Sequence, residues 1–113
     1  MKIVIAGLML LAATSAATAA DVPPGKKTFD RYCAECHAPG HGHPGTQQLE
    51  WTRGKAFSIL EERKDLIPAY IVTVVRNGLH EMAPFRPTEI DDAALSELVV
   101  YLAPPKKVSS KKR

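Results

Sequence analysis

The sequence predicts an all-α fold of four to five short helices. Apolar side chains recur at helical spacing in three stretches of the 113-residue chain, at 25–36, 68–77 and 91–102. Proline and glycine stand around these stretches, where they end regular structure. The pattern is typical of one small helical domain.

The first predicted helix runs from residue 25 to residue 36, and a predicted loop follows at 38–54, where glycine and proline are dense. One face of this helix carries two aromatic side chains and both cysteines of the chain: Phe29, Tyr32, Cys33 and Cys36. Residues 55–63 are predicted as a short helix with Phe57 and Leu60 turned inward.

The stretch 68–77 contains a β-branched run that could also form a strand. A helix is favoured because Pro68 suits a first helical position and Asn77-Gly78 suits a helix end. A loop follows, and Asp91 is then predicted to cap the last helix. The apolar stripe of that helix is formed by Leu95, Leu98, Val99 and Leu102.

Residues 1–20 have the features of a secretory signal peptide, with cleavage expected after Ala19 or Ala20. An uncleaved anchor is the alternative, but the apolar run is short for a spanning helix. We expect a folded domain at 21–103, a disordered basic tail at 104–113, and no membrane span once the signal is removed.

Charge is divided unevenly along the chain. Residues 21–103 hold nine basic and twelve acidic side chains, a net charge of −3, whereas the tail at 104–113 holds five basic ones. The positive net charge therefore comes from the tail. A nucleic-acid partner is not expected, because the folded domain lacks the basic excess that such binding needs.

The segment Cys33-Ala34-Glu35-Cys36-His37 has the pattern C-x-x-C-H, the attachment motif of a c-type haem. Two thiols one helical turn apart can bond the two vinyl groups of one porphyrin, and the adjacent imidazole can ligate the iron. We expect one covalent haem c, with no cysteine left for a structural disulfide.

Two other chemistries use C-x-x-C. A thioredoxin-type dithiol follows a strand, whereas this motif follows a predicted helix. A zinc site usually needs four protein ligands, and the two cysteines could combine with two of the four histidines: His37, His41, His43 and His80. His41 and His43 could also form a surface metal site or be solvated loop residues. The histidine that directly follows the second cysteine favours haem.

The iron needs a ligand on its other face, and Met82 is the one methionine that remains after signal removal. It lies in a predicted loop, just before Pro84 and Phe85, which would stiffen and seal that loop. Coordination by His37 and Met82 would raise the reduction potential. His80 in place of the methionine would give a bis-histidine haem of lower potential.

Three further residues are candidate haem contacts. Trp51 could donate its indole N–H to a haem propionate, or it could fill the core. Arg53 could pair with a propionate or be solvated. The Pro44 carbonyl is the candidate acceptor for the second ring N–H of His37, because a metal-bound histidine usually donates that proton.

Residues 25–103 together resemble the small soluble His/Met cytochromes c. Gly25 and Phe29 match positions in the first helix of that family, and Leu98 and Tyr101 match positions in its last helix. The resemblance implies the cytochrome c fold, in which the N- and C-terminal helices cross where glycine permits close approach, and short helices wrap around one covalent haem.

A narrower resemblance covers residues 60–71, 74–79 and 81–90, which are similar to cytochrome subunits of the p-cresol methylhydroxylase family. It implies a periplasmic carrier of single electrons, not an enzyme by itself. Its electron donor would be a flavoprotein dehydrogenase subunit with covalent FAD that oxidises 4-alkylphenols. The acceptor would be a small copper protein or another cytochrome, and the segment around Met82 would lie near the partner.

Two other functions stay open. The protein could be a free-standing cytochrome c that serves another dehydrogenase or oxidase. It could also be a haem gas sensor or peroxidase, which would require Met82 to leave the iron. Electron transfer is favoured because an iron with both axial positions filled cannot readily bind a substrate.

Overall fold

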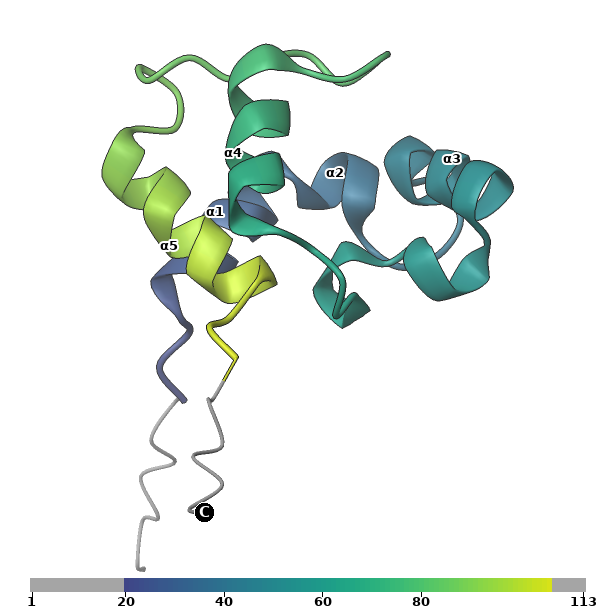
Figure 1. The fold of residues 1–113 in the computed structure, drawn as a ribbon, viewed down its shortest axis with the longest axis horizontal. Helices are drawn as coiled ribbons and strands as arrows, with labels where there is room; N and C mark the ends of the chain where they lie inside the picture. Colours follow the sequence, from purple (N-terminus) through teal and green to yellow (C-terminus); the bar gives the residue numbers. More distant parts are fainter. Residues whose placement is uncertain (1–19, 107–113) are drawn as a thin grey trace, which may run out of the picture.

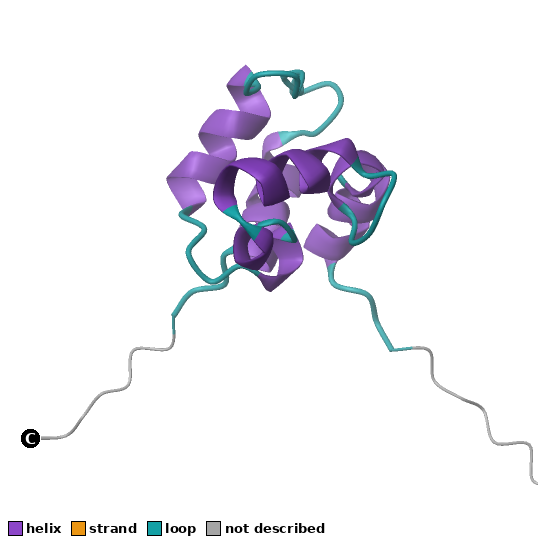
Figure 2. Cartoon of the chain, turned by 90° about the vertical axis from the view of Figure 1, so that its right-hand side faces the viewer, coloured by secondary structure: helices purple, strands orange, loops and turns teal. Residues whose placement is uncertain are grey.

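The computed structural model describes residues 20–106, and every regular element in that range is helical (Figures 1 and 2). The elements in chain order are α1 Pro24–Tyr32, α2 Ala34–His37, α3 Pro44–Arg53, the 3-10 turns η1 Lys55–Phe57 and η2 Leu60–Glu62, α4 Pro68–Asn77 and α5 Asp92–Leu102. The predicted all-α class is confirmed. The predicted signal peptide, except Ala20, and most of the predicted basic tail lie outside the described residues. Within 20–106, no helix has both the length and the apolar character to cross a bilayer.

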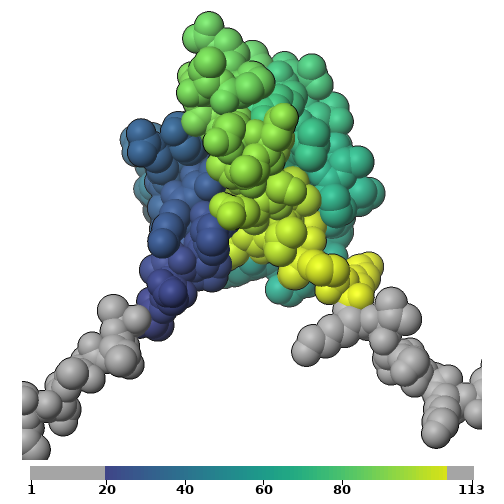
Figure 3. All heavy atoms as spheres, turned by 90° about the vertical axis from the view of Figure 1, so that its left-hand side faces the viewer, coloured from purple at the N-terminus to yellow at the C-terminus, as the bar shows by residue number. Residues whose placement is uncertain are grey.

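The buried core lies where α1, α4 and α5 meet. Each of these helices turns one apolar stripe inward, as the helical repeat requires. The core residues are Phe29, Cys33, Ile71, Val75, Ile90, Leu95, Leu98 and Leu102. Figure 3 shows the surface of α5 between that of α1 and that of α4. α3 packs on α2 and η1 instead, and its only buried residue is Thr46.

α1 packs closely on α5 because Gly25 has no side chain. A Cβ atom at Gly25 would lie 2.2 Å from the Glu97 carbonyl oxygen and 2.5 Å from Tyr101 Cβ. Four residues further along α1, the rings of Phe29 and Tyr101 are 6.3 Å apart. The expected contact between the first and last helices is confirmed.

A polar cluster links η2 to this helix pair. The Tyr101 hydroxyl donates to Glu61, and Lys26 Nζ lies 3.4 Å from the same carboxylate. Burial, followed by the bond to Glu61, raises the pKa of Tyr101 to about 12. The hydroxyl therefore stays protonated and able to donate at neutral pH, so η2 remains tied to α1 and α5.

The predicted ends of α4 and α5 are confirmed. Pro68 begins α4, and Gly78 follows its last residue with φ of +74°. The Asp91 side chain accepts a hydrogen bond of 2.8 Å from the Ala94 amide, as an N-cap residue does.

The segment 33–63 differs from its prediction in three places. The first helix ends at Tyr32, and α2 is a separate turn. The predicted loop at 38–54 is wrong for residues 44–53, because Pro44 occupies a first helical position and α3 follows it. The expected helix at 55–63 is instead two 3-10 turns, and the Phe57 side chain is exposed beside the Arg63 guanidinium.

Gly25→Ala is expected to destabilise the holoprotein. Overpacking costs about 1–3 kcal/mol, whereas the gain in helix propensity is at most about 1 kcal/mol. Since the clash involves the α5 backbone, we expect the free energy of unfolding to fall by about 1–2 kcal/mol in guanidinium titrations followed by circular dichroism. The exposed control Ser96→Ala should change it by less than about 0.5 kcal/mol. Wild-type stability of Gly25→Ala would contradict this packing.

Candidate haem-binding site

The C-x-x-C-H motif lies at the break between α1 and α2. The Cys33 carbonyl accepts hydrogen bonds from the amides of Cys36 at 3.1 Å and His37 at 2.9 Å. This turn keeps the two thiols one helical turn apart, with Cys33 buried in the core and Cys36 exposed. Both thiols are free, so each is available for a bond to a cofactor.

Burial sets the protonation of the motif. It is the main cause that raises the pKa of Cys33 to about 11, with a smaller contribution from Cys36. A thiol that stays protonated at neutral pH is a poor nucleophile for disulfide exchange. Burial also lowers the pKa of His37, so the imidazole is neutral at pH 7 and can bind a metal through a ring nitrogen. Since no three His, Cys, Asp or Glu side chains in residues 20–106 are grouped as zinc ligands, this donor set fits a haem better than a zinc ion or a dithiol centre.

The start of α3 packs directly on the His37 ring. A Cβ atom at Gly45 would lie 2.6 Å from His37 Cε1, 2.8 Å from its Nδ1 and 2.8 Å from the Cys36 carbonyl oxygen. Only glycine lets the backbone approach the imidazole this closely. Gly45 therefore holds the orientation of the ring.

Two hydrogen bonds join the same end of α3 to the motif and to the residue that follows it. His43 Nδ1 lies 2.8 Å from the Glu35 carbonyl oxygen, and Thr46 Oγ1 donates to the Ala38 carbonyl at 2.9 Å. His43 is thus bonded to the backbone, whereas His41 is exposed. Among residues 20–106, no three His, Cys, Asp or Glu side chains form a metal-binding group.

The expected hydrogen bond from His37 to the Pro44 carbonyl is not formed. His37 Nδ1 is buried and is without a hydrogen-bond partner among the described residues. Pro44 is instead the first residue of α3, and a carbonyl in that position is directed along the helix toward the next turn. Because the Gly45 backbone packs against the Nδ1 edge of the ring, Nε2 is the nitrogen that we expect to bind a metal.

Met82 lies in a tight turn just beyond α4. The amide of each of Leu79 and Met82 donates to the carbonyl of the other, at 3.0 and 2.9 Å. A Cβ atom at Gly78 would lie 2.5 Å from the Met82 carbonyl oxygen, so the turn is packed against the end of α4. The Met82 side chain is half-buried, while His80 is exposed at a φ of +52°.

Aromatic contact connects the methionine loop to the motif. The Tyr32 ring, directly before Cys33, meets the Phe85 ring edge-on with centroids 5.9 Å apart. The structure thus brings the residue before the motif into contact with the segment after Met82, although His37 and Met82 are 45 residues apart in sequence.

Trp51 and Arg53 lie in the last turn of α3, and both are exposed. The Trp51 side chain is 80% exposed, so the alternative that it fills the protein core is wrong. Helix α3 contacts α2 and η1, and Trp51 is not part of the buried core formed by α1, α4 and α5.

Sequence reasoning missed the residues that support the ligands. Gly45 and Thr46 hold the His37 side, and Gly78 packs on the Met82 turn. From the sequence, Gly78 was predicted only to end a helix. The Pro-Gly pair that includes Gly45 resembles a loop signal, although proline at a first helical position is equally common.

Residues 20–102 match the family model described as cytochrome C oxidase, cbb3-type, subunit III. The chain belongs to this family of cytochrome c domains, and it is a c-type electron carrier. It is also similar to the cytochrome c subunit of 4-cresol dehydrogenase (hydroxylating) from Pseudomonas putida, with 32% identity over 95 residues. The alignment covers 84% of this chain and 72% of that relative. No solved structure matches the chain significantly.

Gly45→Ala is expected to lower the amount of haem incorporated per chain several-fold. The added methyl group would push the His37 ring from its position, with an overpacking cost of about 1–3 kcal/mol. Haem-stained denaturing gels and the haem-to-protein absorbance ratio measure the effect after export in a host with haem-attachment machinery. The exposed control Gln48→Ala should incorporate haem like the wild type, and a Gly45→Ala variant with full incorporation would contradict the prediction.

Proposed function

We propose that the protein carries single electrons on one haem c, bound covalently through Cys33 and Cys36. His37 and Met82 would be the axial ligands of its iron. The observation that supports this most directly is the motif turn itself, which presents two free thiols and a neutral, half-buried imidazole side by side. A disulfide or a low-pKa thiolate would have argued for different chemistry.

The bound haem supplies one-electron chemistry between Fe(III) and Fe(II). The chain's part is to hold two ligands of different kinds. Gly45 packs on the imidazole, and the turn at Leu79 and Met82 would hold the thioether for the same iron. A thioether ligand raises the reduction potential, and two protein ligands leave no position for a substrate. The protein therefore transfers electrons rather than acting as an enzyme by itself.

Trp51 is the proposed donor to a haem propionate. Its indole N–H is on a side chain that is 80% exposed at the end of α3, where it can reach a carboxylate. Arg53 is the second candidate, on a different face of the helix, because residues two apart do not lie side by side.

The proposed electron donor is a flavoprotein dehydrogenase subunit with covalent FAD. The similarity to the cytochrome c subunit of a 4-cresol dehydrogenase supports this partner. The complex would oxidise 4-alkylphenols in the periplasm and pass electrons to a small copper protein or another cytochrome. Around Met82, the exposed side chains of Leu79, Ala83 and Pro84 offer an apolar surface for the flavoprotein.

Met82→Ala is expected to abolish the thioether-to-iron charge-transfer band in the red region of the oxidised spectrum. The same substitution should let carbon monoxide bind the reduced protein at neutral pH, because one axial position is opened. The matched control is His80→Ala, two residues away in the same turn. It should keep the band. Absence of the band from the wild type, with carbon monoxide binding opened by His80→Ala and not by Met82→Ala, would instead indicate histidine as the ligand.

The partner proposal predicts that the tagged chain, purified from its native periplasm, retains a yellow flavoprotein in a fixed ratio. Adding a 4-alkylphenol to the isolated complex should reduce the haem, while the chain purified alone should stay oxidised. A cytochrome that is isolated without flavin and is reduced only by other dehydrogenases would instead be a free-standing carrier.

A further inference from the structure

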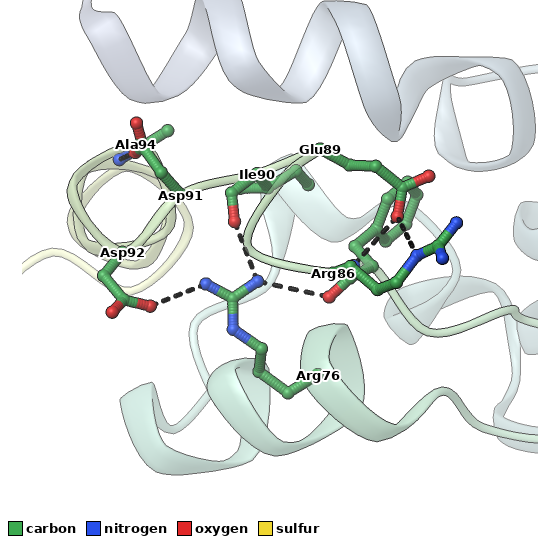
Figure 4. A network of polar contacts seen from close by, with 8 residues as sticks. Arg76, Arg86, Glu89, Ile90, Asp91, Asp92 and Ala94 are labelled. Carbon is green, nitrogen blue, oxygen red and sulfur yellow. Dashed lines mark hydrogen bonds and ion pairs between the residues drawn. The ribbon is translucent and has the colours of Figure 1, made fainter.

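Arg76, in the last turn of α4, binds three points on the chain that follows the methionine turn (Figure 4). Its Nη1 donates to the Phe85 carbonyl at 3.2 Å and to the Ile90 carbonyl at 2.8 Å. Its Nη2 lies 2.8 Å from Asp92 Oδ1, at the start of α5. One guanidinium group thus joins α4, the returning loop and α5.

These three contacts differ in their surroundings. The Asp92 side chain is 92% exposed, so water and salt weaken its ion pair with Arg76. The Arg76 side chain is only 19% exposed, and its bonds to the two carbonyls are shielded. If the guanidinium is removed, both carbonyls lose a charged donor at once.

Both acceptor carbonyls lie in residues 85–90, the part of the Met82 loop that leads back to α5 and is called the return limb below. Figure 1 shows this segment leave α4, extend away from it and come back to α5. The outgoing limb is held by the Leu79–Met82 pair. The return limb is held at Phe85 by two hydrogen bonds. The Phe85 carbonyl accepts from Arg76, and the Phe85 amide donates to the Val75 carbonyl at 2.8 Å. Met82 belongs to the first attachment and lies three residues before the second, at Phe85.

We propose that Arg76 is a positioning residue for Met82, a role that rests on the proposed ligation of iron by this methionine. A thioether is a weak ligand, so it stays on the iron only if its loop holds it there. If the guanidinium group is removed, Phe85 keeps only the hydrogen bond from its amide to the Val75 carbonyl. The Ile90 carbonyl loses its hydrogen bond from Arg76. The loop can then open at Met82 while the core formed by α1, α4 and α5 stays folded.

The test compares Arg76→Lys and Arg76→Gln with Asp92→Asn in the full-length, haem-loaded protein. Lysine keeps the charge but cannot reach both carbonyls, and Asp92→Asn removes only the exposed ion pair. Imidazole should bind the oxidised Arg76 variants about tenfold more tightly than the wild type or more, as expected for the loss of a charge-assisted hydrogen bond. On heating, their red charge-transfer band should disappear well before their helical circular dichroism. Asp92→Asn should match the wild type in both measurements.

A merely structural role for Arg76 gives a different result. The band and the helical signal would then be lost together, with wild-type imidazole affinity, and this would overturn the proposal. Failure of both Arg76 variants to fold would overturn it as well. If Met82→Ala keeps the band, the proposed ligation is wrong. If Met82→Ala loses the band and the Arg76 variants behave as the wild type, only the positioning role is wrong.

Discussion

The close packing of α1 on α5 is the contact on which the rest of the structure depends. Gly25 lets the two backbones approach, and the Phe29 ring then packs near Tyr101. Since the C-x-x-C-H motif begins directly after α1, this packing also fixes where the motif turn points. A wider separation would expose Cys33, which forms part of the same core.

The two predicted ligands are supported in similar ways, by backbone that approaches where a side chain is missing. Gly45 brings the start of α3 onto the His37 ring, and Gly78 brings the end of α4 onto the Met82 turn. Backbone contacts of this kind are less adaptable than contacts between long side chains. They suit an electron carrier, whose ligands should keep their positions when the iron changes its charge.

Local patterns predicted much of the fold. α4 and α5 begin and end as expected, because proline, glycine and the Asp91 cap act within a few residues of themselves. α3 was missed because its first residues are Pro44 and Gly45, which also mark loops. The exposed Trp51 was open to two interpretations from sequence, because burial depends on distant neighbours.

By itself, the sequence determined the candidate donor set, because the spacing of Cys33, Cys36 and His37 is a property of one helical turn. It also singled out Met82, by elimination once the signal peptide is set aside. Only the tertiary structure decided what holds these ligands. The Gly45–His37 contact and the bonds of Arg76 join segments that meet through packing, and no local period in a sequence records which segments will meet.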